Sequence, residues 1–557
     1  MPEPEFDVVV VGSGAGGGAA AWALAERGLR VLLLEAGPAY VPERDYRLDQ
    51  PDWEVSQFPE KQPVAGRQTM APLQLLEPRW DALRSWSHVR GRVVPGRRRR
   101  FGGGYRHVVG LGGSTLHFVG EAHRLHPASM RMATRFGVAA DWPFDYETLE
   151  PYYAQVERLI GVAGTGDGSR RPRSAPYPLP PHPPSYTSRK LAQAAESLGM
   201  SWVANPLAAL SQPYQGRPAC NYCSGCARGC PRRDKGSVDV TFLPRARATG
   251  RCEIRTECAV TQLVAGADDR VSAVEYQDAA GSSQRVAARN VLLAAGAVET
   301  PRLLLLSANS HAPDGLANES GEVGRNFMET LSWYTSALHP EPIGSHRGLP
   351  SDSICWDFNA PDSIPDVIGG CRFSPATAEA DLLGPVSYAQ RVVRGFGRAH
   401  REGVRAALGR VITVGAIGES LPDPHSRIDL DPAQKDANGQ PRARIHSRVE
   451  ESECKRLAFM ARTCRELVAA SGAGKPFEEA GTWDLFNSTH VFGTCRMGHD
   501  PSRSVVDAMG RSHRWKNLYV ADASVFPSSG GGEAPSLTIE ALALRTAEHI
   551  AGRARRN

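Results

Sequence analysis

A glycine-rich turn near the N-terminus has the residue types and spacing of a phosphate-binding site. It spans residues 12–17, follows the apolar run 6–11 and precedes an alanine-rich run. Backbone N–H groups and the positive end of a helix dipole meet at such a turn, where a pyrophosphate can bind. A second apolar run, 29–34, ends at Glu35, which is placed to bind a ribose hydroxyl. This order predicts a dinucleotide site that disfavours a 2′-phosphate, and it leaves open the choice between FAD and NAD.

Four cysteines in the middle of the chain form a second group with ligand spacing. Cys220, Cys223, Cys226 and Cys230 precede Pro231 and give the run C-x2-C-x2-C-x3-C-P. This run is typical of iron–sulfur ligation. A structural zinc site and packing thiols or disulfides are the alternatives. The other seven cysteines have no ligand spacing, and we expect them to be buried thiols: Cys252, Cys258, Cys355, Cys371, Cys454, Cys464 and Cys495.

A second glycine turn, at residues 110–113, is followed by Ser114, Thr115 and His117. Backbone N–H groups and a hydroxyl in this arrangement can form a second anion cradle.

The overall composition bounds the class of protein. A chain of 557 residues with 41% apolar and 22% charged residues is expected to fold into two or more lobes. The net charge of +5 is spread along the chain, so charge does not indicate nucleic-acid binding. The run Arg97–Arg100 is predicted to be a solvated loop, with an acidic partner or cofactor phosphates as its alternative contacts.

The N-terminal residues 1–5 lead directly into the first apolar run, and no stretch of about 18 apolar residues follows. We therefore expect a cytoplasmic protein that does not span a membrane. Export together with a signal-bearing partner remains an alternative.

The predicted architecture is α/β: a Rossmann-like nucleotide lobe and a substrate lobe built on an antiparallel sheet. Helices are expected at 147–160, 190–198, 302–307, 450–470 and 536–553, and residues 40–90 are expected to be irregular. Strands are expected at 251–264, 271–276, 291–296, 411–417, 427–430 and 442–446, with a hairpin turn at 436–439. The nucleotide lobe is assigned 1–160, 216–330 with the four-cysteine run, and 481–557; residues 161–215 are assigned to a linker or an excursion of the substrate lobe, and 331–480 to the substrate lobe itself.

Motifs along the whole chain resemble those of the glucose-methanol-choline (GMC) oxidoreductases, flavoenzymes that oxidise alcohols, and this resemblance selects FAD. Besides the two glycine turns, the matching segments are Trp142-Pro143 with 151–153, 296–304, 323–328, 490–498, 522–527 and 535–539. Residues 116–118 and 235–241 are most similar to the bacterial dehydrogenases of sugars, polyols and gluconate.

The resemblance assigns cofactor-binding roles. It implies that Val260 lends its backbone to the adenine, and that His117 either bonds covalently to the flavin or contacts it without a bond. The ADP half is assigned to Gly12, Ser13, Gly14, Gly17 and Glu35, and the pyrophosphate and flavin to Gly113, Ser114, Asp522 and Ala523.

The resemblance also identifies His490 as the catalytic base, a task for which imidazole is suited because it titrates near neutral pH. The family places a second His or Asn before Pro535, where this chain has Ala534. Glu533 or Asn487 are the candidates to replace it, and a solvated Glu533 is the alternative.

Cys220, Cys226 and Cys230 have the spacing that holds a three-iron cluster in bacterial FAD-dependent sugar dehydrogenases, and Cys223 makes a four-iron cluster possible. The resemblance thus implies a dehydrogenase that oxidises a sugar, polyol or similar alcohol and passes electrons to a cytochrome, a small subunit or a quinone. The alternatives are an O2-using oxidase or biosynthetic tailoring dehydrogenase with structural cysteines, and a noncatalytic flavoprotein electron carrier.

Overall fold

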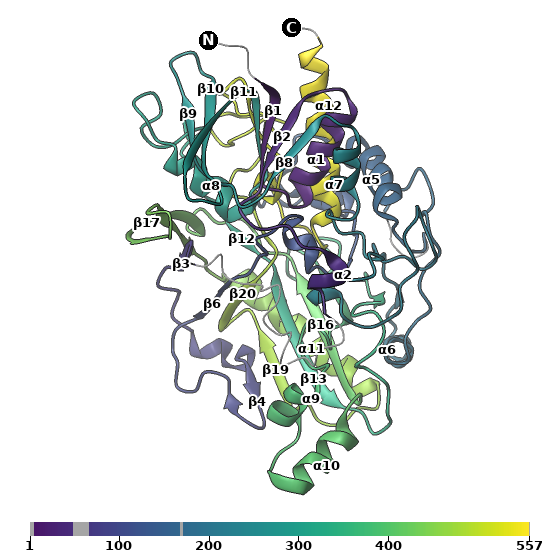
Figure 1. The fold of residues 1–557 in the computed structure, drawn as a ribbon. Coiled ribbons are helices and arrows are strands. Elements are labelled where there is room, and N and C mark those ends of the chain that lie inside the picture. The colour runs from purple at the N-terminus through teal and green to yellow at the C-terminus, as the bar shows by residue number, and fades with distance from the viewer. Residues whose placement is uncertain (1–4, 48–65, 167–170, 556–557) are drawn as a thin grey trace.

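Residues 5–47, 66–166 and 171–555 are described by a computed structural model, and they form two lobes that are each built on a β-sheet (Figure 1). The parts of the expected N-terminal segment, irregular excursion and linker that fall on 1–4, 48–65 and 167–170 lie outside the described residues. The two lobes confirm the predicted α/β class.

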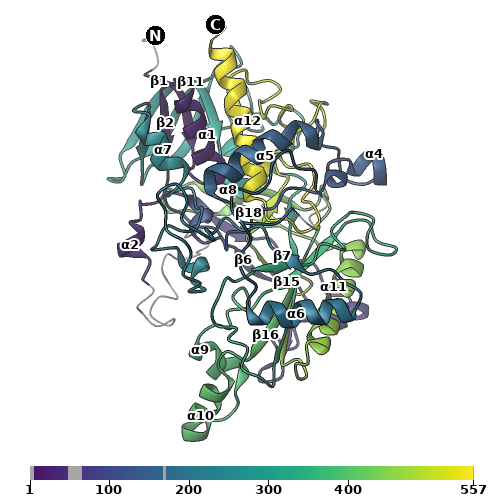
Figure 2. The same cartoon turned by 90° about the vertical axis from the view of Figure 1, so that its right-hand side faces the viewer.

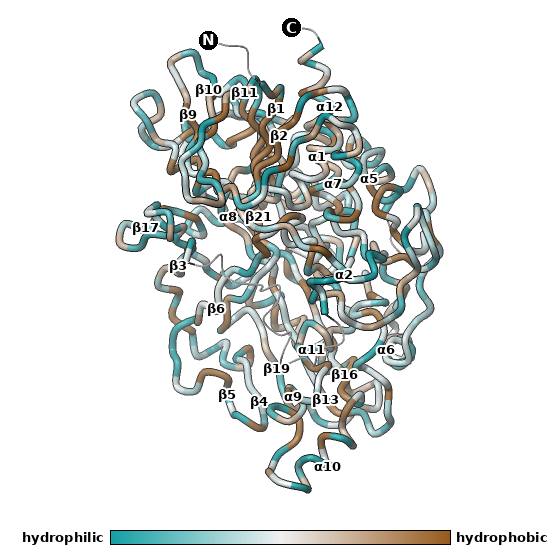
Figure 3. The backbone as a smooth tube through the Cα atoms, viewed as in Figure 1, coloured by the Kyte–Doolittle hydropathy of each residue, from teal (hydrophilic) through white to brown (hydrophobic). Residues whose placement is uncertain are grey.

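The first sheet has a parallel core of buried apolar strands. Val10 lies opposite Leu33 on one neighbouring strand and Leu292 on the other, and all three side chains are buried. Helices α1 (Ala15–Glu26) and α12 (Ser536–Ala554) pack against each other beside these strands. A parallel sheet buried on both faces selects continuous apolar runs, which Figure 3 shows as hydrophobic tubes. Its parallel strands are β8 (Cys252–Arg255), β2 (Val31–Leu34), β1 (Phe6–Val11), β11 (Ser283–Leu293) and β22 (Leu518–Val520).

One long strand, β11, joins the parallel core to an antiparallel extension. Its first half pairs with β10 (Val271–Gln277), which pairs with β9 (Ala259–Ala265), and its second half pairs with β1. The expected strand at 291–296 is therefore only the end of β11. The single strand expected at 251–264 is two strands, β8 and β9.

Helix α8 (Gly296–Leu306) begins earlier than predicted, so Pro301 lies inside it. A proline cannot donate to the carbonyl four residues before it, which here belongs to Ala297. That carbonyl accepts instead from the Thr494 hydroxyl at 2.7 Å. A residue nearly 200 positions away thus allows a proline that sequence reasoning places at the helix start.

The second sheet is antiparallel, and its two faces differ in character. Trp333, Phe373 and Val414 lie on the buried face, in a core that includes Leu457 and other residues of α11. Helix α6 (Tyr186–Ser197) packs on α11 (Glu451–Ala470), as Figure 2 shows. The strand order is β15 (Cys371–Pro375), β16 (Val411–Gly418), β13 (Leu331–Leu338), β19 (Glu478–Gly481), β4 (Trp86–Ser87) and β5 (Gly91–Arg92).

Two short strands join the second sheet although their sequence positions assign them to the nucleotide lobe. Strands β4 and β5 fall in the range 1–160 that was expected in that lobe, whereas α6 lies in the range expected to be a linker or an excursion of the substrate lobe. Two-residue edge strands carry no alternation that a sequence pattern can detect. Pairing of Glu479 with Trp86 across the sheet edge fixes them.

The hairpin of β17 (Arg427–Lys435) and β18 (Pro441–His446) confirms the predicted turn. Its Gly439 N–H donates to the Asp436 carbonyl at 3.0 Å. The remaining helices are α2 (Pro42–Asp45), α4 (Met132–Phe136), α5 (Tyr146–Ile160), α7 (Phe242–Ala248), α9 (Pro385–Ser387) and α10 (Gly397–Ala407). The remaining strands are β3 (Gln68–Met70), β6 (Phe101–Tyr105), β7 (Val203–Ala204), β12 (Met328–Glu329), β14 (Ser353–Ile354), β20 (Leu485–Ser488) and β21 (Val491–Phe492).

The arginine run at 97–100 is only partly the solvated loop that we expected. Arg98 is exposed, but Arg100 is buried and its guanidinium lies 2.5 Å from the Glu329 carboxylate. Burial of a charge requires such a partner, and Glu329 is too distant in sequence to be predicted as one.

Among the helices of the described residues, none has the length and apolar character needed to cross a membrane.

Candidate active site

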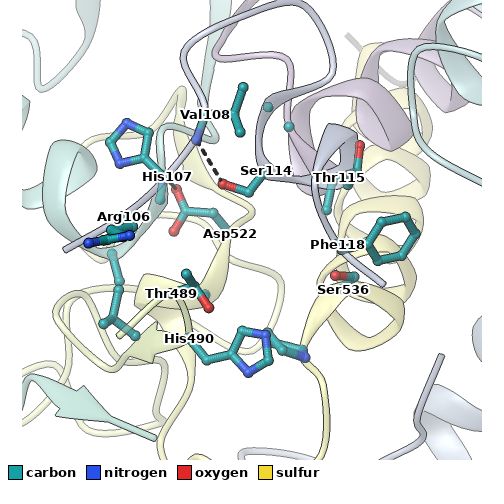
Figure 4. A pocket seen from close by; sticks show the side chains of 18 of the residues that line it. Arg106, His107, Val108, Ser114, Thr115, Phe118, Thr489, His490, Asp522 and Ser536 are labelled. Carbon is teal, nitrogen blue, oxygen red and sulfur yellow. Dashed lines mark hydrogen bonds between the residues drawn. The ribbon is translucent and has the colours of Figure 1, made fainter. Parts of the chain in front are cut away.

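A single cavity extends from the glycine turn of the first lobe to the second sheet, and residues of both lobes line it. At one end lie Gly12, Ser13 and Glu35, and at the other lie Tyr334 and Arg372. In the close-up of Figure 4, Ser114 and Asp522 face this cavity from one part of its wall and His490 from another.

At the first-lobe end, Glu35 orders the glycine turn. One carboxylate oxygen accepts hydrogen bonds from the Ser13 N–H at 3.0 Å and the Ser13 hydroxyl at 2.6 Å. The other accepts from the Gly37 N–H at 2.9 Å. Burial raises the pKa of Glu35, while these donors act in the opposite direction. The carboxylate retains lone pairs for ribose hydroxyls at the cavity wall.

The two glycine turns meet where a pyrophosphate would need backbone donors. A Cβ at Gly113 would lie 2.8 Å from the Cα of Gly14, so a side chain there would clash. Gly113 also has a φ of +56°, in the left-handed region that favours glycine. The nearby Ser114 hydroxyl accepts from the Val108 N–H at 3.2 Å.

Asp522 connects this cradle to α8. Its carboxylate accepts from the Gly296 N–H at 2.9 Å, the Thr300 hydroxyl at 2.6 Å and the Ser524 N–H at 2.8 Å. The bare glycine backbone at the start of α1, the buried Glu35 and the fixed Asp522 fit a dinucleotide such as FAD.

Most residues expected to bind the cofactor line this one cavity: Gly12, Ser13, Gly14, Glu35, Gly113, Ser114, His117, Val260, Asp522 and Ala523. Gly17 is the exception. A Cβ there would lie 1.8 Å from the Gly12 carbonyl oxygen, so this glycine allows helix α1 to pack on the turn.

His490 and Asn487 reach the cavity from the segment around β20 and β21. The His490 carbonyl accepts from the Thr330 N–H at 3.1 Å, the Thr330 hydroxyl at 3.3 Å and the Ser488 hydroxyl at 2.9 Å. These three bonds fix the backbone that presents the imidazole.

Glu533 does not line the cavity, and this corrects the expectation that it replaces the second catalytic side chain. Its carboxylate lies 2.8 Å from the Arg171 guanidinium and accepts from the His126 N–H at 3.0 Å. The side chain is buried, so the solvated alternative is also wrong. Arg171 lies 362 residues away, and no sequence pattern connects the two. Ala534 does line the cavity, and its N–H donates to His123 Nδ1 at 3.0 Å.

The cavity-facing side of the second sheet is polar. Ser332 and Tyr334 alternate on β13, and Arg372 and Ser374 alternate on β15, so each pair shares one face. Arg372 lies 2.5 Å from the carboxylate of Glu121, which also lines the cavity. Sequence analysis missed these residues. The period-two alternation of polar side chains in these strands was the available signal.

His107 also lines the cavity, beside Arg106 (Figure 4). Burial lowers the pKa of its imidazole to about 3, with the charge of Arg67 adding to the effect, so the ring is neutral. His499, by contrast, is exposed.

The cysteine loop, residues 218–231, lies behind the cavity wall. The Lys235 ammonium donates to the carbonyl of Cys226 at 2.8 Å and to those of Leu116 and Phe118 at 2.8 and 3.0 Å. The latter two residues flank His117. The cysteine loop is therefore joined directly to the wall that contains His117.

Three thiols of the cysteine loop, those of Cys220, Cys226 and Cys230, are half-buried, and Cys223 is exposed. Burial raises the pKa of Cys220 to about 12, with Asp234, Cys223 and Cys230 adding to the shift. Within the described residues, however, no group of three or more His, Cys, Asp or Glu side chains is arranged to hold a metal ion. The cluster therefore stays a prediction from the cysteine spacing, and no reaction step is assigned to one. Of the other seven cysteines, six are buried as predicted and Cys252 is half-buried.

Comparisons with known proteins agree with this geometry. A GMC oxidoreductase family model matches residues 111–331, its C-terminal counterpart matches 422–543, and an NAD(P)-binding Rossmann-like domain matches 10–40. The chain is 30% identical to the fructose dehydrogenase large subunit of Gluconobacter japonicus, covering 98% of this chain and 97% of the relative. It is 32% identical to the 6‴-hydroxyparomomycin C oxidase of Streptomyces lividus, covering 98% and 91%.

The fold is similar to that of a solved formate oxidase from Aspergillus oryzae, with a TM-score of 0.64, 16% identity and coverage of 99% of each chain. The family models together match more than half of the chain, and the relatives are similar over nearly its whole length. Both findings agree with the dinucleotide cradle described above. The chain belongs to the GMC oxidoreductase family and is an FAD-dependent oxidoreductase.

Proposed function

We propose that this enzyme oxidises an alcohol group of a sugar, polyol or similar hydroxylated small molecule to a carbonyl. When bound, FAD supplies the hydride acceptor. His490 takes the hydroxyl proton, because a neutral imidazole is a suitable base near pH 7 and this side chain lines the cavity.

The observation that carries this proposal is the position of His490 and the polar sheet face in one cavity with the dinucleotide cradle. Hydroxyl donors and acceptors at Ser332, Tyr334 and Ser374 suit a substrate with several hydroxyl groups. The similarity to a fructose dehydrogenase large subunit and to a 6‴-hydroxyparomomycin C oxidase supports the same substrate class.

Anaerobic reduction of the flavin by a panel of sugars, polyols and simple aliphatic alcohols tests the proposal. We expect at least one polyhydroxylated compound to bleach the flavin, and His490→Ala to slow this reduction by about 10²–10⁴-fold. His499→Ala, a change at an exposed histidine, is the matched control. The proposal fails if no alcohol reduces the wild-type flavin, which would favour a noncatalytic electron carrier, or if His490→Ala reacts at the wild-type rate.

Asn487 is proposed as an auxiliary group in the same reaction. It lines the cavity three residues before His490, where its amide can hydrogen-bond a substrate hydroxyl.

Covalent attachment of the flavin to His117 is a separate proposal, supported by the position of this residue in the cavity wall. Acid-precipitated protein that retains its yellow colour would support attachment, whereas full release of FAD would exclude it.

We also propose that the cysteine loop binds an iron–sulfur cluster, of the 3Fe-4S or 4Fe-4S type, with Cys220, Cys223, Cys226 and Cys230 as candidate ligands. Their spacing and the Lys235 connection to the cavity wall support this proposal. An enzyme with such a cluster is expected to pass electrons to a protein or quinone acceptor. The alternative is an O2-using oxidase or a tailoring dehydrogenase with structural cysteines.

Iron and acid-labile sulfide analysis with low-temperature EPR tests the cluster on anaerobically purified protein. We expect Cys226→Ser to remove the iron and Cys355→Ser, at a buried thiol outside the loop, to retain it. Zinc without iron or sulfide would reject the proposal. Peroxide release in air, compared with dye reduction, separates the oxidase from the dehydrogenase.

A further inference from the structure

Ala534 lines the cavity at the position where the family has a His or Asn. Its methyl side chain cannot hydrogen-bond a substrate oxygen. Arg372 lies beside this position. Its Nε donates to the carbonyl of Gly532, two residues before Ala534, at 2.8 Å. A Cβ at Gly532 would lie 2.3 Å from the Ile417 carbonyl oxygen and 3.1 Å from the Arg372 Cγ, so the glycine allows this segment to pack closely on strand β16 and the arginine stem.

Three hydrogen bonds fix the Arg372 guanidinium, and they do not use all of its N–H groups. Besides Gly532, it donates to the Ser374 hydroxyl at 2.9 Å and to the Glu121 carboxylate at 2.5 Å. A guanidinium has five N–H donors. These three bonds leave two donors without a partner among the described residues, on a side chain that lines the cavity.

Buried hydrogen bonds connect the Arg372–Glu121 pair to the backbone of Ala534. Glu121 accepts from the Asn205 amide at 3.0 Å, and the Asn205 oxygen lies 2.8 Å from His123 Nε2. His123 Nδ1 accepts from the Ala534 N–H, which requires the proton of the neutral ring to be on Nε2. Burial lowers the pKa of His123 to about 4, which keeps the ring neutral.

Glu121 also shares the cavity with the proposed base. Burial raises the pKa of Glu121, but Arg372 and other neighbours outweigh this effect and lower it. Arg372, Glu121 and His490 line the same cavity. The arginine therefore faces the same space as the proposed base.

We propose that the Arg372 guanidinium binds the oxygen of the hydroxyl group that is oxidised, and so replaces the side chain that Ala534 lacks. This inference rests on the proposed function. As His490 takes the proton, negative charge grows on the substrate oxygen, and charged N–H donors held in advance stabilise it. Glu121 acts as a positioning residue that orients the guanidinium and balances its charge.

Two measurements on Arg372→Ala test the proposal. In anaerobic stopped-flow, the limiting rate of flavin reduction is expected to fall about 10²–10³-fold. Addition of millimolar guanidinium chloride is expected to raise the limiting rate of the variant at least tenfold. In a titration of the oxidised enzyme followed by flavin absorbance, acetate is used as an anionic probe of the oxygen site. We expect its Kd to rise at least tenfold in the variant.

Arg465→Ala is the matched control, because Arg465 also pairs with a glutamate of the second sheet, Glu479, but does not line the cavity. It should change neither measurement. If Arg372→Ala loses its flavin, Arg372→Lys is used instead, with a rate loss of about tenfold and unchanged thermal stability expected.

The inference is overturned if the limiting rate and the acetate Kd stay within threefold of wild type, or if the rate loss resists guanidinium while acetate binding is unchanged. A wild-type flavin that no alcohol reduces would reject the proposed function instead, and the acetate titration would still report on Arg372.

Discussion

The ammonium of Lys235 and the carbonyl oxygen of Cys226 lie 2.8 Å apart. The same ammonium holds the carbonyls of Leu116 and Phe118 on either side of His117. Lys235 is only 1% exposed, and burial lowers its pKa. One buried cation therefore joins the cysteine loop to the cavity wall, although the two segments are separated by about 100 residues.

We predict that Lys235→Met destabilises the protein by about 2–4 kcal/mol, because three buried carbonyl groups lose a charged donor. The cysteine loop and the wall near His117 should loosen together, so FAD affinity should also fall. Denaturant unfolding and FAD titration of the apoprotein measure the two effects. Lys190→Met, at an ion pair whose carboxylate, Glu341, is exposed, should change neither, and equal effects of both variants would contradict the prediction.

Glu35 fixes the glycine turn before any dinucleotide binds, through its bonds to Ser13 and Gly37. We predict that Glu35→Ala raises the Kd for FAD about 10–100-fold, since charge-assisted hydrogen bonds of this kind contribute about 1.5–3 kcal/mol. Quenching of FAD fluorescence on binding to apoprotein gives the Kd. Glu253→Ala, on the neighbouring strand β8, is the exposed control, and an unchanged Kd in Glu35→Ala would refute this role.

Gly415 determines the shape of the substrate end of the cavity. It pairs with Tyr334 on one neighbouring strand and Ser374 on the other. A Cβ there would lie 3.1 Å from the Tyr334 ring and 2.6 Å from the Cβ of Ala376. The absent side chain therefore makes room for the tyrosine ring on the polar face.

We predict that Gly415→Val displaces this ring and raises KM at least tenfold, while the bound-flavin absorbance spectrum is unchanged. Overpacking of this kind costs about 1–3 kcal/mol. Gly418→Val on the same strand meets Met460 on the core side and should lower thermal stability with little effect on KM. Steady-state kinetics and thermal unfolding of both variants decide the matter, and a KM effect in Gly418→Val alone would contradict the assignment of faces.

The sequence predicts elements whose signals are local. Helix α5 was placed within one residue because Asp145 caps its start, with the side chain accepting from the Thr148 N–H, and Gly161 ends it in a left-handed conformation. The glycine turn and Glu35 were likewise identified from adjacent residues. Such features depend on the chain only within about one turn or one βαβ unit.

Features that depend on distant contacts could not be predicted. The burial of Glu533 depends on Arg171, and the position of Arg372 depends on Glu121 and Gly532. A sequence pattern shows that a strand alternates, but it does not show which face meets the cofactor cavity. The polar face of the second sheet therefore became identifiable only when the two lobes were seen together.

Glu419 is a buried carboxyl outside the cavity, and its protonation should control stability. Burial raises its pKa from 4.5 to about 7; Glu533 adds to the shift and Arg456 opposes it. One carboxyl oxygen has no hydrogen-bond partner among the described residues. The folded state thus holds this proton more tightly than the unfolded state does. Its stabilising contribution is fully present below pH 4.5 and is lost as the pH rises through 7.

We therefore predict that Glu419→Gln, which cannot ionise, is more stable than wild type at pH 8 by roughly 1–3 kcal/mol and nearly equal to it at pH 5. Thermal unfolding of the flavin-loaded proteins at several pH values measures this difference. Glu253→Gln should show no such trend, because its carboxyl is exposed. A stability gain in Glu419→Gln that is the same at pH 5 and pH 8 would mean that altered packing, rather than the ionisation of Glu419, causes the effect.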